Sequence, residues 1–176
     1  MVVPTEVDVW QGEIAELEVD AIIIPANESL FMTAPVARSV RLRAGDVVER
    51  MAVDQGPAAA GTAVVTAGGQ LAAPYVIHAV AVGHELRADL ARLTLAIDAS
   101  LDIAERLGLA RLATSAIGTE RGVFTAEQAA DGLAEVLAER SARNAWLPGS
   151  MVVVVGSAAE ATAYRAALDP LRAPAQ

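Results

Sequence analysis

The chain has 176 residues, of which 54% are hydrophobic and 20% charged, so it is long enough to bury the core of one domain and too apolar to be disordered. Its formal charge of -9 argues against DNA or RNA as partners, because binding to a phosphate backbone depends on lysine and arginine. The chain has no cysteine, which excludes disulfide bonds, thiolate nucleophiles and thiolate metal ligands.

Targeting and membrane segments are not expected. The first residues lack the basic stretch and apolar run of a secretory signal, and no later run reaches the roughly 18 apolar residues of a membrane span. We therefore expect a cytoplasmic protein with no membrane partner. The sequence predicts a single domain over residues 1–176, with its core at about 7–168 and a frayed tail at 172–176.

Short apolar runs alternate with longer segments of helical periodicity, which is typical of helices packed on both faces of a buried sheet. The class of fold is therefore α/β. The predicted strands are residues 7–10, 19–24, 62–66, 75–80, 112–114 and 151–155. Helices are predicted at 35–43, at 46–55, at about 89–107, after Thr125 and after Ser157.

Local signals set the expected ends of these elements. Pro25 is predicted to end the second strand, because proline cannot donate to the ladder of a central strand. Gly108 is predicted to end the helix that starts near Asp89. Thr125–Gln128 fits a capping box at the start of one helix, and Ser157–Glu160 fits another at the start of the last helix.

Asn27 is the first candidate functional residue. It follows directly after a buried strand, and ligands of open α/β sheets bind beyond the carboxyl ends of the strands. An asparagine at this point also serves as the cap of a turn. From this segment alone, both roles stay open.

Four segments in order resemble the macrodomain family, which binds ADP-ribose. The family carries Gly-Asp-Ile-Thr and then a strand that ends in Asn-Ala-Ala-Asn; this chain has Glu13 in place of the aspartate and Asn27 as the final asparagine. The resemblance extends over about residues 7–168. The matching segments are Gly12–Ile14 with Val19–Asn27, Gly61–Thr66, Tyr75–Val80, and Ala113–Thr119 with Gly122–Phe124.

The resemblance implies a three-layer α/β/α sandwich around a mixed sheet of about six strands. It also implies a site in which Glu13 faces the adenine, Asn27 contacts the distal ribose, and two loops surround the diphosphate. No cofactor or metal site is expected. The implied ligand-binding residues are Glu13, Ile14, Asn27, Thr33, Val36, Arg38, Ser115, Ala116, Ile117, Gly118, Thr119, Glu120, Arg121, Gly122, Val123 and Phe124.

The loops depart from the family pattern. A run of glycines in the family is replaced by the segment 32–36, in which Pro35 has no N–H to offer a phosphate. Ala37 stands where one hydrolase branch has an aspartate that positions water. Glu120 places a carboxylate beside the expected diphosphate, and Arg38 and Arg121 are the cations that would offset it.

The two histidines are assigned no catalytic role. His78 lies in an apolar strand and is predicted to be a core residue, and His84 lacks the second histidine of a zinc-binding helix.

Three hypotheses follow for the function. The first is a module that binds ADP-ribose or a related adenine-nucleotide derivative. The second is a hydrolase of ADP-ribosyl or O-acetyl-ADP-ribose conjugates, with Asn27 as the catalytic residue that aligns water. The third is a degenerate macrodomain that binds a different ligand or a protein partner.

Overall fold

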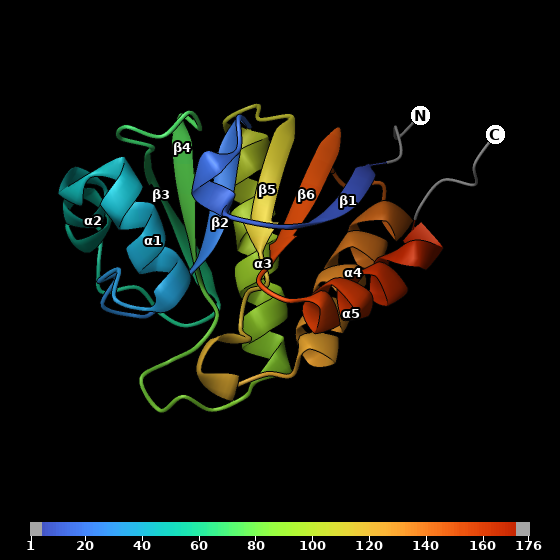
Figure 1. Ribbon diagram of the computed structural model, residues 1–176. Helices are drawn as coiled ribbons and strands as arrows, with labels where there is room; N and C mark the ends of the chain where they lie inside the picture. Colours follow the sequence, from blue (N-terminus) through green and yellow to red (C-terminus); the bar gives the residue numbers. More distant parts are fainter. Residues whose placement is uncertain (1–4, 172–176) are drawn as a thin grey trace.

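The computed structural model describes residues 5–171 and contains one six-stranded sheet (Figure 1). The order of the strands is β1-β6-β5-β2-β4-β3, and all neighbours are parallel except β3, which is antiparallel to β4. The predicted tail at 172–176 lies outside the described residues. The strands are β1 (Glu6–Gln11), β2 (Ala21–Ala26), β3 (Thr62–Ala67), β4 (Tyr75–Val80), β5 (Arg111–Ser115) and β6 (Ser150–Val155).

The helices begin at the caps that the sequence indicates. Thr125 and Gln128 form the complete capping box, whereas the Ser157 hydroxyl caps the Glu160 N–H without the reciprocal bond, because the Glu160 carboxylate accepts from the Gly156 N–H. The α-helices are α1 (Pro35–Ala44), α2 (Asp46–Val53), α3 (Leu90–Arg106), α4 (Ala126–Ala142) and α5 (Ala158–Leu168). The 3-10 turns are η1 (Ile14–Glu16), η2 (Glu120–Gly122) and η3 (Asp169–Leu171).

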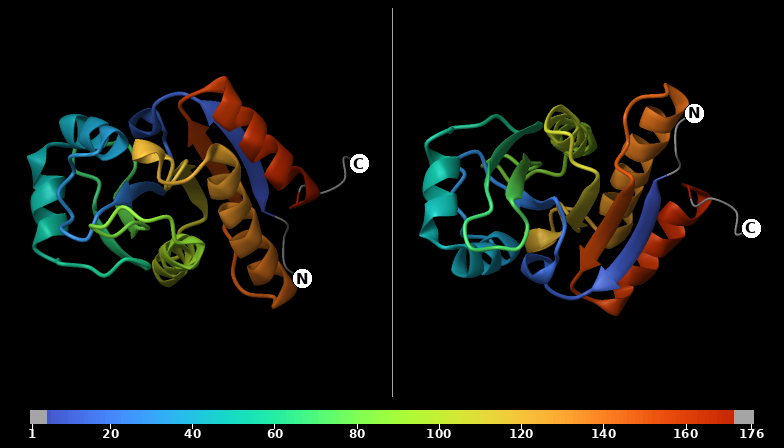
Figure 2. Two further views of the ribbon diagram at one scale, coloured as in Figure 1. Left: turned by 90° about the horizontal axis from the view of Figure 1, so that it is seen from below. Right: turned by 90° about the horizontal axis from the view of Figure 1, so that it is seen from above.

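The alternating side chains of β2 belong to two separate cores. Ile23 packs in the cluster formed with α3, α4 and α5, whereas Ile22 and Ile24 pack in the cluster formed with α1, α2 and η1. The helices therefore form one layer on each face of the sheet (Figure 2). This arrangement confirms the predicted three-layer α/β/α sandwich with a mixed six-stranded sheet.

The prediction that Pro25 ends the second strand was wrong, because β2 continues to Ala26. The pairing of β2 with β5 ends at Ile23, whereas its pairing with β4 continues to Ala26. Pro25 thus lies where β2 has one partner strand only, which limits the ladder bonds that its missing N–H removes. The longer strand places Asn27 just beyond the carboxyl end of β2.

Two polar groups tie the central strands together. The carboxylate of Asp20 accepts hydrogen bonds from the N–H groups of Ala110 (2.9 Å) and Arg111 (2.8 Å), which joins the start of β2 to the start of β5. His78 is buried in β4, as predicted, and its Nε2 lies 3.0 Å from the Thr66 hydroxyl. Burial lowers the pKa of His78 to about 4. Among residues 5–171, no helix is long and apolar enough to cross a bilayer.

Candidate ligand-binding cleft

Two adjoining cavities, which share Glu120 in their walls, open at the carboxyl ends of the parallel strands, where ligands bind in open α/β sheets. The Asn27 lobe has a volume of about 270 Å³ and is lined by residues from the segments 25–37, 81–86 and 118–123. The Glu13 lobe has a volume of about 340 Å³ and is lined by residues from the segments 12–14, 35–39, 115–120 and 154–160. The start of α1 lies between the lobes.

Most of the predicted ligand-binding residues line one of these lobes. Those of the Asn27 lobe are Asn27, Thr33, Gly118, Glu120, Arg121 and Val123. Those of the Glu13 lobe are Glu13, Ile14, Val36, Ser115, Ala116, Thr119 and Glu120. Four predicted residues line neither lobe: Arg38, Ile117, Gly122 and Phe124. Arg38 is exposed on α1, whereas Ile117 and Phe124 are buried in the core beneath the loop.

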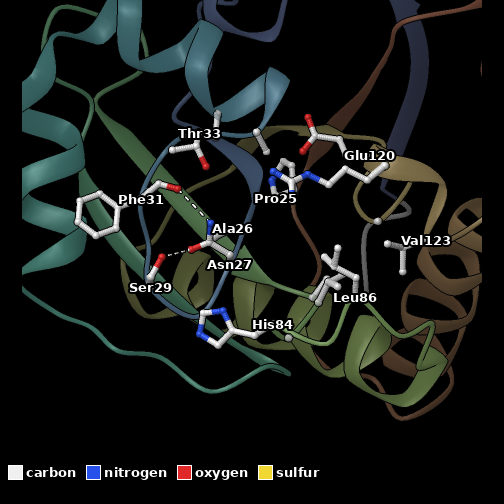
Figure 3. A pocket seen from close by; sticks show the side chains of 17 residues that line it. Pro25, Ala26, Asn27, Ser29, Phe31, Thr33, His84, Leu86, Glu120 and Val123 are labelled. Atoms are coloured by element: carbon white, nitrogen blue, oxygen red, sulfur yellow. Dashed lines mark hydrogen bonds between the residues drawn. The ribbon is translucent and has the colours of Figure 1, made fainter.

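Asn27 both shapes its loop and faces the cavity. Its Nδ2 donates to the carbonyl of Phe31 (3.2 Å), and its Oδ1 accepts from the Ser29 hydroxyl (2.7 Å), as Figure 3 shows. The turn role that the sequence left open is therefore real. Because an asparagine amide has two N–H donors and two acceptor lone pairs, one donor and one acceptor position remain for a ligand.

The loop before α1 directs its first amides away from the lobes. The N–H of Met32 donates to the Glu49 carboxylate (2.7 Å), and the N–H of Thr33 donates to the carbonyl of Phe31 (3.0 Å). The side chain of Met32 is buried in the core. With no N–H on Pro35, this loop offers a phosphate fewer backbone donors than a run of glycines would.

Glu120 lines both lobes and connects the η2 loop to α1. Its Oε1 accepts a hydrogen bond of 2.7 Å from the N–H of Val36, in the first turn of α1. A carboxylate is favoured there because the first amides of a helix lack partners within the helix and carry partial positive charge. Burial raises the pKa of Glu120, although the Val36 N–H and the nearby Arg121 act in the opposite direction.

The Glu13 lobe contains a hydroxyl without a partner. The Oγ of Ser115 is buried at the end of β5 and has no hydrogen-bond partner among the described residues. The carboxylates of this lobe are engaged: Glu13 accepts from the Ser39 hydroxyl (3.1 Å), and Glu160 accepts from the Gly156 N–H (2.7 Å). A buried hydroxyl without a partner in the protein indicates a position that a ligand or water completes.

Gly118 holds the second loop close to the core. Its φ of +94° lies in the left-handed region that favours glycine, and a Cβ added there would lie 2.7 Å from the ring of Phe124. The neighbouring Arg121 also has a positive φ, of 59°, without being glycine. This segment therefore depends on a backbone path that few side chains tolerate.

Several residues of the Asn27 lobe were not predicted from the sequence. His84, Phe31 and Leu86 lie around the cavity, as Figure 3 shows, and all three are exposed. The N–H of His84 donates to the Glu28 carboxylate (3.1 Å). The signal that pointed to Asn27 also applied here, because the segment 81–86 follows the end of the parallel strand β4.

The chemical groups of the cleft suit recognition of a polar organic ligand. Amide, hydroxyl and carboxylate groups are spaced along an apolar floor, and one carboxylate, Glu120, lines the Asn27 lobe. No group of three or more His, Asp or Glu side chains within residues 5–171 is placed to hold a metal ion.

Comparison with known proteins identifies relatives of this chain. The family model described as "Macro domain" matches residues 23–133. An uncharacterized protein of Mycobacterium tuberculosis is 34% identical over 166 residues, which cover 93% of this chain and 45% of that protein. The chain thus spans about half the length of the curated relatives it matches first.

Solved structures share the fold at low sequence identity. The Oceanobacillus iheyensis macrodomain with ADP superposes with a TM-score of 0.85 at 19% identity, over 97% of this chain and 94% of that one. The Trypanosoma brucei macrodomain in complex with ADP-ribose superposes with a TM-score of 0.84 at 19% identity, over 93% and 69%. Identities this low establish the shared fold alone.

Proposed function

This chain belongs to the macrodomain family, and from that premise we propose that it is a module that binds ADP-ribose or a related adenine-nucleotide derivative. The observation that carries the proposal is the pair of lobes on the two sides of the start of α1. A ligand with a nucleoside at one end, a ribose at the other and phosphates between them matches this arrangement. Two family members solved with ADP-ribose or ADP have the same fold.

In the proposed complex, each end of the ligand occupies one lobe. The adenine lies in the Glu13 lobe, where the Ile14 side chain and the end of β6 supply apolar surface. The distal ribose lies in the Asn27 lobe, where the remaining acceptor and donor of the Asn27 amide accept from one ribose hydroxyl and donate to another. The phosphates cross the start of α1, because helix N-termini attract anions.

A second candidate is a macrodomain whose cleft has changed its ligand. The specific observation in its favour is the hydrogen bond from the Val36 N–H to Glu120, which fills the position of an anion at the start of α1. The amides of Met32 and Thr33 are also engaged within the protein. Under this candidate the cleft takes a ligand without a diphosphate.

Calorimetric titration with ADP-ribose, AMP and ribose 5-phosphate distinguishes the candidates. The proposed function predicts that ADP-ribose binds more tightly than either fragment, since it occupies both lobes. If none of the three compounds binds while circular dichroism shows an intact fold, the proposed function is wrong and the candidate with a changed ligand replaces it. Incubation with an ADP-ribosylated peptide tests hydrolysis: release of ADP-ribose that Asn27→Ala abolishes would assign a hydrolase.

A matched pair of threonine variants tests the position of the ligand. Thr33 lines the Asn27 lobe and is exposed, whereas Thr162 is exposed on α5, away from both lobes. We expect Thr33→Ala to weaken ADP-ribose binding by about tenfold, the usual effect of one lost hydrogen bond to a polar ligand, and Thr162→Ala to leave it unchanged. Equal effects of the two variants would contradict the assignment of the lobe.

A further inference from the structure

We propose that Glu120 is a built-in competitor for the ligand's phosphate, which couples binding of the ligand to release of the Glu120 carboxylate from α1 and to uptake of a proton. This inference rests on the proposed function, because it concerns the same cleft. It assigns to Glu120 the control of which anions enter, and at what pH.

The contact between Glu120 and Val36 occupies the donor that an incoming phosphate needs. Pro35 is the first residue of α1 and has no N–H, so Val36 supplies the first amide of the helix. That amide donates to Glu120 Oε1 at 2.7 Å, across 84 positions of sequence. A phosphate can take the Val36 N–H only after the carboxylate has left it.

Ser115 is the independent indication that a larger anion fits at this place. Its buried hydroxyl lines the same lobe as Val36 and Glu120 and has no hydrogen-bond partner among residues 5–171. The Glu120 carboxylate satisfies the Val36 amide and leaves the Ser115 hydroxyl unsatisfied. A phosphate group, which presents several oxygens around one centre, can accept from both donors at once.

The charged groups around Glu120 are of both signs. The side chains that line the two lobes with it are Glu13, Glu160, Arg121 and His84. Arg38, on α1 itself, is exposed and lines neither lobe. The Glu13 lobe therefore contains three carboxylates and no basic side chain, so a phosphate placed there meets repulsion that Arg121 offsets from the other lobe only.

Binding of an anion has a definite consequence for the protonation of Glu120. Burial already raises its pKa, against the effects of the Val36 N–H and Arg121. A phosphate that replaces the carboxylate at Val36 removes a favourable hydrogen bond and adds a like charge, and both changes raise the pKa further. The complex then binds more protons than the free protein, so affinity for the anion increases as the pH falls.

Nuclear magnetic resonance of the free protein tests the first half of the proposal. The amide proton shift of Val36 should change as the Glu120 carboxylate takes up its proton, at a higher pH than for an ordinary glutamate, and the Glu120→Gln variant should show no such step. Glu127→Gln is the matched control, because Glu127 is an exposed glutamate in the first turn of α4, outside both lobes. A Val36 amide insensitive to Glu120→Gln would overturn the proposal.

Calorimetry with ADP-ribose and with pyrophosphate tests the second half. At about pH 7.5, we expect Glu120→Gln to bind ADP-ribose about tenfold more tightly than the unmodified protein, and Glu127→Gln to match the unmodified protein. As the pH is lowered, the advantage of Glu120→Gln should shrink, because protonation of Glu120 removes the negative charge that the variant lacks. His84→Gln should keep this pH dependence, which separates the carboxylate from the imidazole.

The outcomes separate failure of the inference from failure of the proposed function. Equal or weaker binding of ADP-ribose by Glu120→Gln, with the unmodified protein binding well, overturns the competitor role alone. If no protein binds ADP-ribose but Glu120→Ala binds pyrophosphate more tightly than the unmodified protein does, the competitor role stands and the proposed ligand is wrong. If Glu120→Gln and Glu120→Ala bind neither compound, both proposals fall.

Discussion

The buried His78 makes the stability of this fold depend on pH, and the size of the effect follows from its position. The side chain lies in the central strand β4 with 1% of its surface exposed, and burial lowers its pKa from 6.5 to about 4. The unfolded chain takes up a proton below about pH 6.5, whereas the folded protein does so only near pH 4. Stability that is fully present above pH 6.5 is therefore lost as the pH falls, by about 3 kcal/mol in total.

Urea unfolding followed by circular dichroism, at intervals from about pH 7.5 to about pH 4, measures this loss. The comparison is with His78→Gln, which keeps a polar group for Thr66 and removes the titration. The chain has two histidines, so His84→Gln is the natural control for an exposed imidazole. Carboxylates titrate in the same range, but they are common to all three proteins and cancel in the differences.

We expect the free energy of unfolding of the unmodified protein to fall by about 3 kcal/mol more than that of His78→Gln between pH 7 and pH 4. His84→Gln retains His78, so its free energy of unfolding should also fall more than that of His78→Gln. Parallel pH profiles for the unmodified protein and His78→Gln would refute the argument, since they would mean that His78 is protonated equally in both states.

Three further variants test contacts that hold the fold together and one that shapes the cleft. Asp20→Ala should lower the free energy of unfolding by about 2 kcal/mol at neutral pH. Burial raises the pKa of this carboxylate, but its hydrogen bonds to Arg111 and Ala110 outweigh burial and lower the pKa overall. The difference from the unmodified protein should disappear in acid, as the pH falls below the unfolded pKa of 3.8. Arg140→Met should cost about 3 kcal/mol in urea unfolding, because this buried guanidinium binds Asp98 and Asp102. Gly118→Ala should lower the melting temperature and weaken ADP-ribose binding together, because the new methyl group meets Phe124; an unchanged affinity would show that the loop does not shape the site.

The predicted layers and strands follow from signals that are local in sequence. The apolar run of β6 and the cap at Thr125 depend on residues within a few positions of each other, and β6 and α4 form where the patterns place them. The apolar run at 19–24 also forms a strand, but β2 is Ala21–Ala26, two residues further along the chain. Pro25 was misjudged because its effect depends on how far the neighbouring strand β5 extends, and the sequence of β2 does not contain that length.

The site was less predictable, because its decisive contacts join distant segments. The sequence placed a charge of the wrong sign at Glu120, but the bond to Val36 that gives this charge a role spans 84 positions. Arg38 was expected to offset the charge, but it is exposed on α1 and lines neither lobe. Its neighbours Ala37 and Ser39 do line the lobes, and successive side chains of a helix point about 100° apart. The hydroxyl of Ser115 shows its missing partner only in three dimensions.

Amide chemical shifts recorded with and without ADP-ribose show which part of the protein binds it. We expect saturating ADP-ribose to shift amides of both lobes, Ile14 and Gly156 in one and Asn27 and Gly118 in the other, together with Val36 at the start of α1. AMP alone should shift the amides of the Glu13 lobe only. Shifts confined to one lobe with full-length ADP-ribose, or none at all, would contradict a cleft that holds the two ends of the nucleotide on either side of α1.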